Sequence, residues 1–176
     1  GEGRTTGLLF RWKGASSAEP TVLMAHYDVV PVEEQRWAHP PFCGEVFDGE
    51  LWGRGTLDTK ITLLGVMEAA ESLIRQGFVP KQDVYFAFGG DEEVSGHGAK
   101  DIIAYLKQQG VKPAFVVDEG GAVVDGVFPG VTQPLAVIGI GEKGMMDVVL
   151  TAKSEGGHAS HPTRPSAVGS MAKAVA

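Results

Sequence analysis

The chain alternates short apolar runs with longer segments in which apolar residues recur every three or four positions, and glycines separate the two kinds. The runs have the length of buried strands, whereas the longer segments have the period of amphipathic helices. The predicted strands are 8–12, 21–25, 84–88 and 114–117, and the predicted helices are 61–76 and 99–109. Strands that alternate with helices favour an α/β fold, so we expect a mostly parallel sheet with helices on both faces.

Two further patterns complete the outline of the chain. Asp48-Gly49, within the alternating stretch 44–54, is a two-residue turn signal that predicts a hairpin. Beyond Gly144 the pattern changes, with a half-exposed strand expected at 146–152 and a helix of small residues beginning at 166. We therefore predict two domains, at 1–143 and 144–176, of which the second is the beginning of a small α+β domain.

Composition excludes several classes of protein. With 43% hydrophobic residues in 176, the chain has enough apolar surface to bury a core. Its formal charge of −7 argues against a nucleic-acid partner bound through a basic patch, and no apolar run approaches the roughly 20 residues that cross a bilayer. The single cysteine, Cys43, rules out an internal disulfide or a zinc site made of several cysteines.

Polar residues gather directly after the predicted strands. The four clusters are His26-Tyr27-Asp28, the segment 53–58, the segment 89–93, and Asp118-Glu119. Ligands of open α/β sheets bind at the carboxyl ends of the strands, so we expect these clusters to lie close together. Histidine nitrogens mixed with carboxylate oxygens, without thiolates, suit zinc, with manganese or cobalt as possible substitutes.

Each of these residues also has a plainer explanation when it is taken alone. His26 would be an ordinary hydrogen-bonded histidine, Asp58 a helix cap, Glu92 and Glu93 a solvated acidic loop, and Asp118 a turn residue. Without a metal site, all four plain explanations would have to hold at once, at successive strand ends of one sheet. Because these explanations are independent, such a coincidence is rare, and the pattern favours a metal site.

The same clusters resemble the motifs of a known family. The segments 23–31, 51–60, 90–96 and 117–121 are similar, in order, to those of the co-catalytic zinc peptidase family that contains carboxypeptidase S, acetylornithine deacetylase and succinyl-diaminopimelate desuccinylase. The stretch 37–42, together with Glu142-Lys143-Gly144, looks most like the carboxypeptidase S branch. That branch contains peptidases and hydrolases of N-acyl amino acids.

The resemblance implies a ligand set for two zinc ions. His26 and Asp118 would bind the first zinc, Glu93 the second, and Asp58 would bridge both. It also implies a cis peptide bond between Asp58 and Thr59. Many relatives carry Asp at the position of Thr59, so the chain departs from the family pattern there.

Three further residues receive roles from the same resemblance. Asp28 would orient the ring of His26, and Glu92 would act as the general base on a metal-bridging water that attacks the amide carbonyl. His158, in Gly156-Gly157-His158-Ala159-Ser160, matches the motif of the family's lid domain and would stabilise the oxyanion. The implied substrate is a small peptide or an N-acyl amino acid.

Family members are longer than this chain. It opens on Gly1 rather than Met and stops within a helical pattern at Ala176, so we expect 1–143 to lack a return segment with a last histidine ligand and 144–176 to be a truncated lid and dimerisation domain. This piece is then expected to be inactive by itself, and the whole protein to be a homodimer. Without a visible signal peptide, we expect a cytoplasmic location.

Other functions remain open on the sequence. A deacetylase or desuccinylase of amino-acid biosynthesis shares the proposed chemistry, and a metal-binding module without catalysis shares the ligands. The string Gly89-Gly90-Asp91-Glu92-Glu93 also resembles the signature of cyclases that make cyclic diguanylate. Those cyclases do not need His26 or Asp58, and Glu93 replaces their aromatic residue, which disfavours this third alternative.

Overall fold

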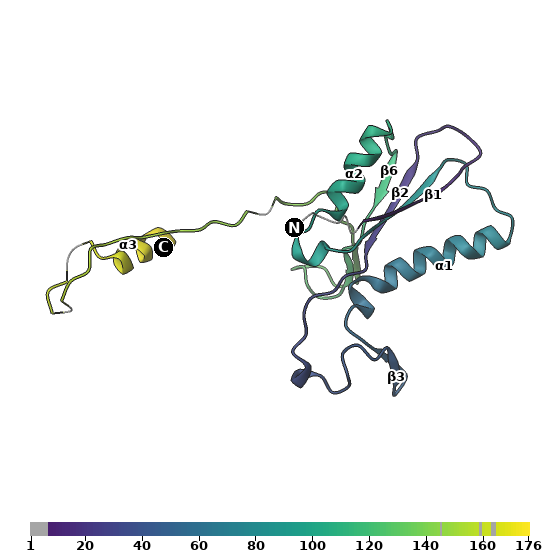
Figure 1. The fold of residues 1–176 in the computed structure, drawn as a ribbon. Helices are drawn as coiled ribbons and strands as arrows, with labels where there is room; N and C mark the ends of the chain where they lie inside the picture. The colour runs from purple at the N-terminus through teal and green to yellow at the C-terminus, as the bar shows by residue number, and fades with distance from the viewer. Residues whose placement is uncertain (1–6, 145, 159, 163–164) are drawn as a thin grey trace. The chain divides into compact units, whose positions relative to one another are not determined.

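The computed structural model describes residues 7–144, 146–158, 160–162 and 165–176 (Figure 1). These residues divide into two compact units, of which the first ends at Val137 and the second begins at Ile138. Each unit is described by itself below. The boundary predicted between residues 143 and 144 concerns the domains of the whole protein and stays a prediction.

A four-stranded sheet forms the centre of the first unit. Its order is β1 (Leu8–Trp12), β5 (Val84–Gly89), β2 (Thr21–His26) and β6 (Phe115–Val117). β5, β2 and β6 run parallel, while β1 lies antiparallel to β5 at one edge. The four strands are those that the sequence predicts, and the sheet is mixed but mostly parallel.

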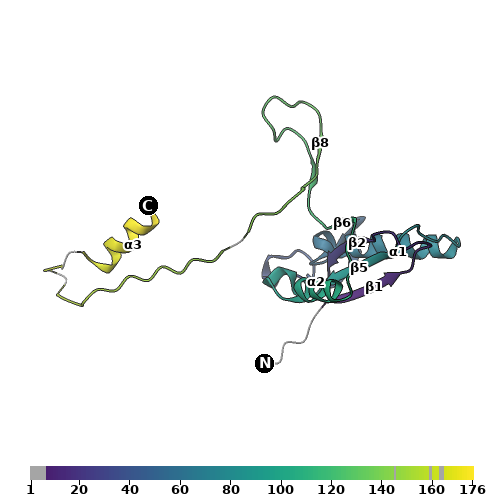
Figure 2. The same cartoon turned by 90° about the horizontal axis from the view of Figure 1, so that it is seen from above.

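Side chains of β5 alternate between two apolar layers, because successive residues of a strand point to opposite faces. Tyr85 and Ala87 pack with the buried residues Ile102 and Leu106 of α2 (Gly98–Gln108). On the other face, the cluster consists of Ala25, Phe86, Phe88 and Ala70, the last of these from α1 (Ile61–Arg75). Figure 2 shows the two helices on opposite sides of the sheet, which confirms the expected α/β architecture.

The two helices begin and end where local chemistry requires. Gly77 and Gly110 follow α1 and α2 with φ of 73° and 69°, left-handed values that glycine adopts without strain. At the start of α2 the carboxylate of Asp91 accepts hydrogen bonds from the backbone N–H groups of His97 and Gly98. Asp91 thereby satisfies N–H groups that have no partner within the helix.

A hairpin projects between β2 and α1, as the Asp48-Gly49 signal predicts. β3 (Glu45–Phe47) pairs with β4 (Glu50–Trp52), and the turn residues have φ of 51° and 85°. A 3₁₀ turn, η1 (Glu34–Arg36), precedes it. The ring of His39 stacks on Phe47 at 3.7 Å between centroids, so aromatic contacts rather than a large core support this hairpin.

Two elements differ from the sequence prediction. β7 (Ala122–Val124) pairs with β8 (Leu135–Val137) in a hairpin that the sequence prediction does not include. The strand expected at 146–152 is wrong, because these residues form no strand in the structure. Alternation of side chains alone does not make a strand, which also needs a neighbour to accept its backbone hydrogen bonds.

The second unit contains one helix, α3 (Ala167–Val175), among its described residues. The side chain of Ser166 accepts a hydrogen bond from the backbone N–H of Gly169 at 3.0 Å, which caps the helix and explains where it begins.

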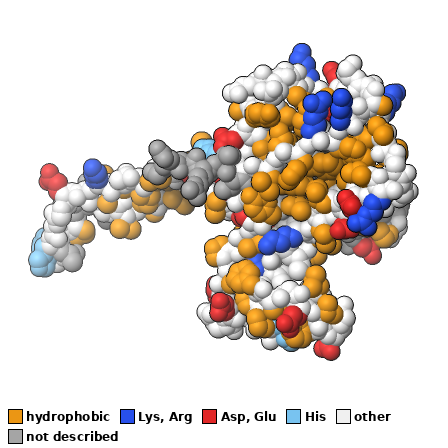
Figure 3. Space-filling view, turned by 45° about the vertical axis from the view of Figure 1, so that its right-hand side comes forward, with side chains coloured by type: hydrophobic (Ala, Val, Ile, Leu, Met, Phe, Trp, Pro, Cys, Tyr) orange, Lys and Arg blue, Asp and Glu red, His pale blue; other side chains and the backbone are white. Residues whose placement is uncertain are grey.

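Apolar side chains also reach the surface of the first unit. Figure 3 shows hydrophobic side chains spread over the face turned toward the viewer. Phe10, Ile74 and Phe78 are among those that are about half exposed. Within the described residues, no helix combines the length and the hydropathy that a membrane crossing demands.

Candidate metal centre

The parallel strands bring the polar clusters to one end of the sheet. His26 is the last residue of β2 and lies opposite Gly89, the last residue of β5. Val117 ends β6, opposite Leu23 of β2, and is followed at once by Asp118 and Glu119. The carboxyl ends of three strands therefore meet here, as the sequence predicts.

The imidazole of His26 is buried and held from one side. Its side chain is 3% exposed. Nδ1 lies 3.1 Å from the backbone carbonyl oxygen of Asp28 and 3.3 Å from its carboxylate Oδ1. A carbonyl oxygen can only accept a hydrogen bond, so Nδ1 carries the proton in this contact. In the neutral ring the lone pair is then on Nε2. Such a ring presents Nε2 to a metal.

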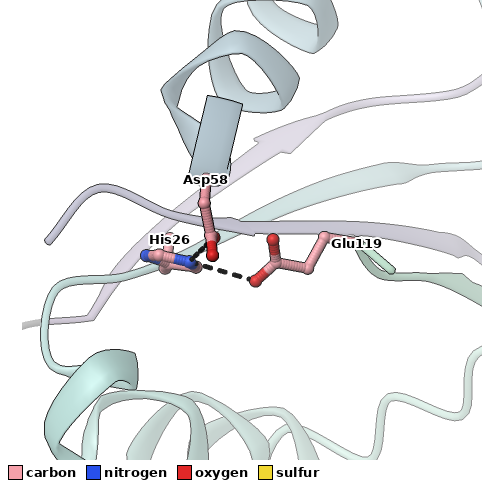
Figure 4. Close-up of side chains that lie close together, drawn as sticks. All are labelled: His26, Asp58 and Glu119. Atoms are coloured by element: carbon pink, nitrogen blue, oxygen red, sulfur yellow. Dashed lines mark hydrogen bonds and ion pairs between the residues drawn. The ribbon is translucent and has the colours of Figure 1, made fainter. Parts of the chain in front are cut away.

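Two carboxylates approach Nε2 (Figure 4). Asp58 Oδ1 lies 2.9 Å and Glu119 Oε1 3.1 Å from this nitrogen. Figure 4 shows Asp58 descending from the start of the α1 segment and Glu119 entering from the segment after β6. Among the described residues, the three side chains His26, Asp58 and Glu119 form a group whose ligand atoms lie within 4.8 Å of one another.

The crowding of charges shifts three pKa values upward. Burial lowers the pKa of His26, but the hydrogen bond to Asp58 and the charges of Glu119 and Glu92 outweigh burial and raise it. Burial raises the pKa of Glu92 and of Glu119, and neighbouring carboxylates raise both further against the opposing effect of His26. Two carboxylates facing one nitrogen need a positive charge between them, either a proton or a metal cation.

Glu92 and Glu93 follow β5 in a 3₁₀ turn, η3 (Glu92–Val94). Glu92 Oε2 lies 3.9 Å from His26 Nε2, at the edge of the group. The backbone N–H of Glu93 donates to Asp28 Oδ2 at 3.0 Å, so Asp28 connects the His26 ring to the turn that carries both glutamates. The other oxygen of Asp28, Oδ1, is buried and accepts no hydrogen bond from the residues that the structure describes.

Asp58 owes its position to an irregular turn, η2 (Thr56–Lys60), just before α1. Gly55 precedes the turn with φ of 88°, and a Cβ on it would lie 2.5 Å from Cγ1 of Val29, so only glycine fits. The Asp58–Thr59 peptide bond is cis, as the resemblance implies. Thr59, which departs from the family pattern, is buried, and its hydroxyl donates to the hydroxyl of Thr62 at 2.7 Å.

Other predicted site residues lie outside the group around Nε2. The side chain of Asp118 is exposed and accepts a hydrogen bond from the N–H of Glu119 at 2.9 Å. His158 belongs to the second unit, where its Nδ1 lies 2.8 Å from the hydroxyl of Ser160. The metal role of Asp118 and the catalytic role of His158 stay predictions.

Sequence reasoning did not assign Glu119 a role. Its only signal is adjacency, since Asp118 and Glu119 form one acidic pair after β6. Successive side chains of an extended segment point to opposite sides, so the pair cannot both face His26. The sequence does not say which of the two does, and the structure turns Glu119 toward the histidine.

A cavity of about 320 Å³ adjoins the group. Asp58 and Glu93 line it together with Trp37, Trp52 and Arg54. A larger cavity of about 890 Å³ lies against β1 and α2, but none of the predicted site residues lines it. The smaller cavity is therefore the one placed for chemistry at this centre.

The donor set fits a divalent metal such as zinc. One imidazole nitrogen and several carboxylate oxygens converge, and a cation at Nε2 would relieve the repulsion between Asp58 and Glu119. Such a metal supplies a Lewis acid and lowers the pKa of a bound water toward 7. His26 and Asp58 would hold it, with the carboxylate of Glu119 in reach.

Comparison with protein families confirms the resemblance. The model of peptidase family M20/M25/M40 matches residues 22–176, which include every cluster described above. The chain belongs to this family. The residues around His26 thus belong to a chain of a family of metal-dependent peptidases and amidohydrolases.

Curated relatives fall in the branch that the sequence indicates. The N-fatty-acyl-amino acid synthase/hydrolase PM20D1 of Xenopus tropicalis is 45% identical over 169 residues, covering 95% of this chain and 33% of the relative. A probable carboxypeptidase S-like 2 of Dictyostelium discoideum is 44% identical over 173 residues, covering 96% of this chain and 33% of the relative. The chain thus spans about a third of the length of these relatives.

Solved structures share the fold at lower identity. A metallo-carboxypeptidase of the M20 family from Sulfolobus solfataricus aligns with a TM-score of 0.58 at 24% identity, over 68% of this chain and 27% of that chain. Human carnosine dipeptidase 1 aligns with a TM-score of 0.55 at 21% identity, over 64% of this chain and 24% of that chain. These likenesses establish the α/β fold.

Proposed function

We propose that the whole protein is a zinc-dependent hydrolase that cleaves the amide bond of an N-acyl amino acid or a small peptide. The observation that carries this proposal is the convergence of Asp58 and Glu119 on Nε2 of the buried His26. The names of the relatives support the substrate class, since one is named a hydrolase of N-fatty-acyl amino acids and the other a probable carboxypeptidase. Both kinds of substrate have an amide bond one residue away from a free carboxylate.

Different side chains are proposed to bind the metal and to orient its histidine ligand. His26 and Asp58, with Glu93 and a carboxylate of the Asp118–Glu119 pair, would hold two zinc ions. Zinc, when bound, polarises the amide carbonyl and acidifies a water. The backbone carbonyl of Asp28 accepts from Nδ1 of His26, and its carboxylate lies 3.3 Å from the same nitrogen, so that Nε2 is left to face the metal.

Glu92 is proposed as the general base. Burial and the neighbouring carboxylates raise its pKa from the ordinary value against the opposing effect of His26, which makes the carboxylate a stronger base. Its Oε2 lies 3.9 Å from His26 Nε2, close to where water and substrate would meet. Glu92 would take a proton from the attacking water and deliver it to the leaving amine.

The test is a substitution of Glu92 in the full-length protein. Glu92→Ala is expected to lower kcat for an N-acyl amino acid by about 10²- to 10⁴-fold, the contribution of a positioned base. Zinc content, measured by mass spectrometry, should stay unchanged. The matched control is Glu68→Ala, because Glu68 is an exposed glutamate of α1. Full activity of the Glu92 variant would remove this residue from the reaction.

Two related proposals concern the lid domain. We propose that the whole protein forms a homodimer through its lid domain and that His158 acts on the oxyanion from there. Analytical ultracentrifugation of the full-length protein checks the first, since a monomer at micromolar concentration contradicts it.

A further inference from the structure

Apolar side chains line the cavity of about 320 Å³ that adjoins the metal centre. Asp58 and Glu93 border it on the side of the centre, and the large apolar residues around it are Val30, Trp37, Leu51, Trp52 and Leu57. Pockets for small organic ligands have this composition, in which apolar side chains surround a few polar groups, and volumes from roughly 300 Å³ upward. The cavity therefore has the size and the lining of a subsite for an apolar part of a ligand.

Two of these apolar residues are leucines that are exposed to solvent. Leu57 immediately precedes Asp58 and is 86% exposed, and Leu51 of β4 is 56% exposed. A single exposed leucine is ordinary on a protein surface, but here two of them border the same cavity as two tryptophans. An apolar group bound in the cavity would remove both side chains from water, which favours its binding.

Aromatic contacts hold the two tryptophans of the cavity in place. Trp37 packs edge-on against Trp52, with 6.4 Å between ring centroids. The guanidinium of Arg54 lies over Trp37, with 5.2 Å between Cζ and the ring centroid, and the ring of His39 meets Trp52 edge-on at 4.7 Å. Rings that are ordered before a ligand arrives lose little conformational entropy when it binds.

The charges along the cavity favour an uncharged occupant. Its lining contains the carboxylates of Glu50, Asp58 and Glu93, and Arg54 is the one basic residue among the described residues that border it. A bound metal would offset the charges of Asp58 and Glu93, which leaves Glu50 and Arg54 with opposite signs. Such a lining gives a carboxylate no net attraction. Of the two ends of an N-acyl amino acid, the acyl end is therefore the one that suits the cavity.

We propose that this cavity binds the acyl chain of the substrate and that Leu51 and Leu57 make the protein prefer a long aliphatic chain. The inference rests on the proposed function, because it concerns the acyl side of the amide bond at the metal centre. Asp58 and Glu93 border the cavity, so a chain bound there begins beside the metal ligands. An acetyl group is too short to fill the cavity and a succinyl group carries a charge, so the inference opposes a deacetylase or a desuccinylase.

The test varies the acyl chain of one N-acyl amino acid. The N-acetyl, N-hexanoyl and N-decanoyl compounds are given to the zinc-loaded full-length protein, unchanged or with Leu57→Ser. For the unchanged protein, kcat/KM should rise by up to about fourfold for each methylene that the cavity buries. Leu57→Ser should lower kcat/KM for the N-decanoyl compound by about 10-fold and change the N-acetyl value by less than about threefold. An equal loss for all three compounds overturns the proposal.

Control variants separate binding from folding. Leu51→Ser should give the same selective loss, and Leu51 lies in β4, on a different element from the metal ligands. It therefore decides the question if zinc content or thermal unfolding shows that Leu57→Ser is merely unstable. Val79→Ser removes another exposed apolar side chain, which does not border the cavity, and should leave all three compounds unaffected.

A second comparison identifies the side of the amide bond that occupies the cavity. The amino acid is changed from glycine to leucine while the acyl group stays N-decanoyl. If the loss caused by Leu57→Ser depends on the amino acid and not on the acyl chain, the cavity binds the other side of the amide and the proposal is overturned.

A binding measurement distinguishes this inference from the proposed function. Calorimetric titration of Glu92→Ala protein with the N-acetyl and N-decanoyl compounds measures affinity without turnover. Tighter binding of the N-decanoyl compound that Leu51→Ser reduces supports the proposal, even if the wild type hydrolyses neither compound. Equal affinity of the two compounds, binding of neither, or a preference that the Leu51 and Leu57 variants both retain overturns it, even if hydrolysis is found.

Discussion

The two sides of the site differ in how far their own residues satisfy one another. On the histidine side, which consists of His26, Asp58 and Glu119, the contacts at Nε2 are 2.9 and 3.1 Å. On the arginine side, which consists of Trp37, Arg54 and Glu93, the residues line a cavity, and the guanidinium Nε has no acceptor within the part of the chain that the structure describes. The first arrangement needs a small cation, whereas the second has room for a larger ligand.

Asp28 is the link between the two sides, so its removal should have the largest effect of the three changes that follow. Its carboxylate contacts His26 Nδ1 and the N–H of Glu93. Asp28→Ala is expected to weaken zinc binding by about 10- to 100-fold, as for residues that orient a ligand, measured by competition with a chelator. Asp101→Ala, an exposed aspartate of α2, is the control. Unchanged affinity would mean that the two sides are held independently.

Gly55 lies between Arg54 and Asp58 and so belongs to both sides. Gly55→Ala places a side chain at φ of 88° and against Val29, which should destabilise the protein by about 1–3 kcal/mol. Thermal unfolding measures this loss, and zinc affinity should fall with it because Asp58 is displaced. Gly65→Ala is the matched control, because a Cβ at this glycine of α1 meets no atom within 4 Å. If Gly55→Ala is as stable as the wild type, the turn does not position the two sides.

The smallest effect is expected for a substitution of Asp83, which lies just before β5 and belongs to neither side of the site. The N–H of Gly14 donates to Asp83, which lowers the pKa of this carboxyl against the effect of burial, and Arg11 lowers it further. The stabilisation is therefore present above the ordinary value of 3.8 and is lost as the pH falls through the lowered pKa. Asp83→Asn should lower the melting temperature at pH 7 by about 2–4 °C, which corresponds to about 1 kcal/mol.

The same variant serves as a negative test of the comparison. The melting temperatures of Asp83→Asn and the wild type should converge as the pH falls through the lowered pKa of Asp83, since the carboxyl of the wild type is then protonated. Zinc affinity should not change, because Asp83 belongs to neither side of the site. A lower zinc affinity would show that the far end of the sheet controls the metal centre.

The outcome for the acidic clusters shows where sequence reasoning reaches its limit. The sequence predicts that the clusters of His26 and Asp58 lie close together, and the structure brings them within hydrogen-bond distance, although Asp58 comes from the turn before α1 and not from a strand end of the central sheet. Within the string Asp91-Glu92-Glu93, however, three similar side chains have three different environments. Asp91 caps α2, Glu92 approaches His26, and Glu93 lines the cavity with Asp58. Residue type does not distinguish them, because their orientation depends on how η3 packs.

The sequence by itself determined the alternation of strands and helices, the end of the sheet where polar groups collect, and the family. These follow from local periodicity, from glycine at the joints, and from motifs that are read along the chain. Only the tertiary structure decided that Glu119 rather than Asp118 faces Nε2 and that 146–152 forms no strand. It also decided that Arg54 stacks on Trp37 while its Nε finds no acceptor among the described residues. Each of these depends on contacts between residues distant in the chain or on the presence of a pairing partner, which no local pattern specifies.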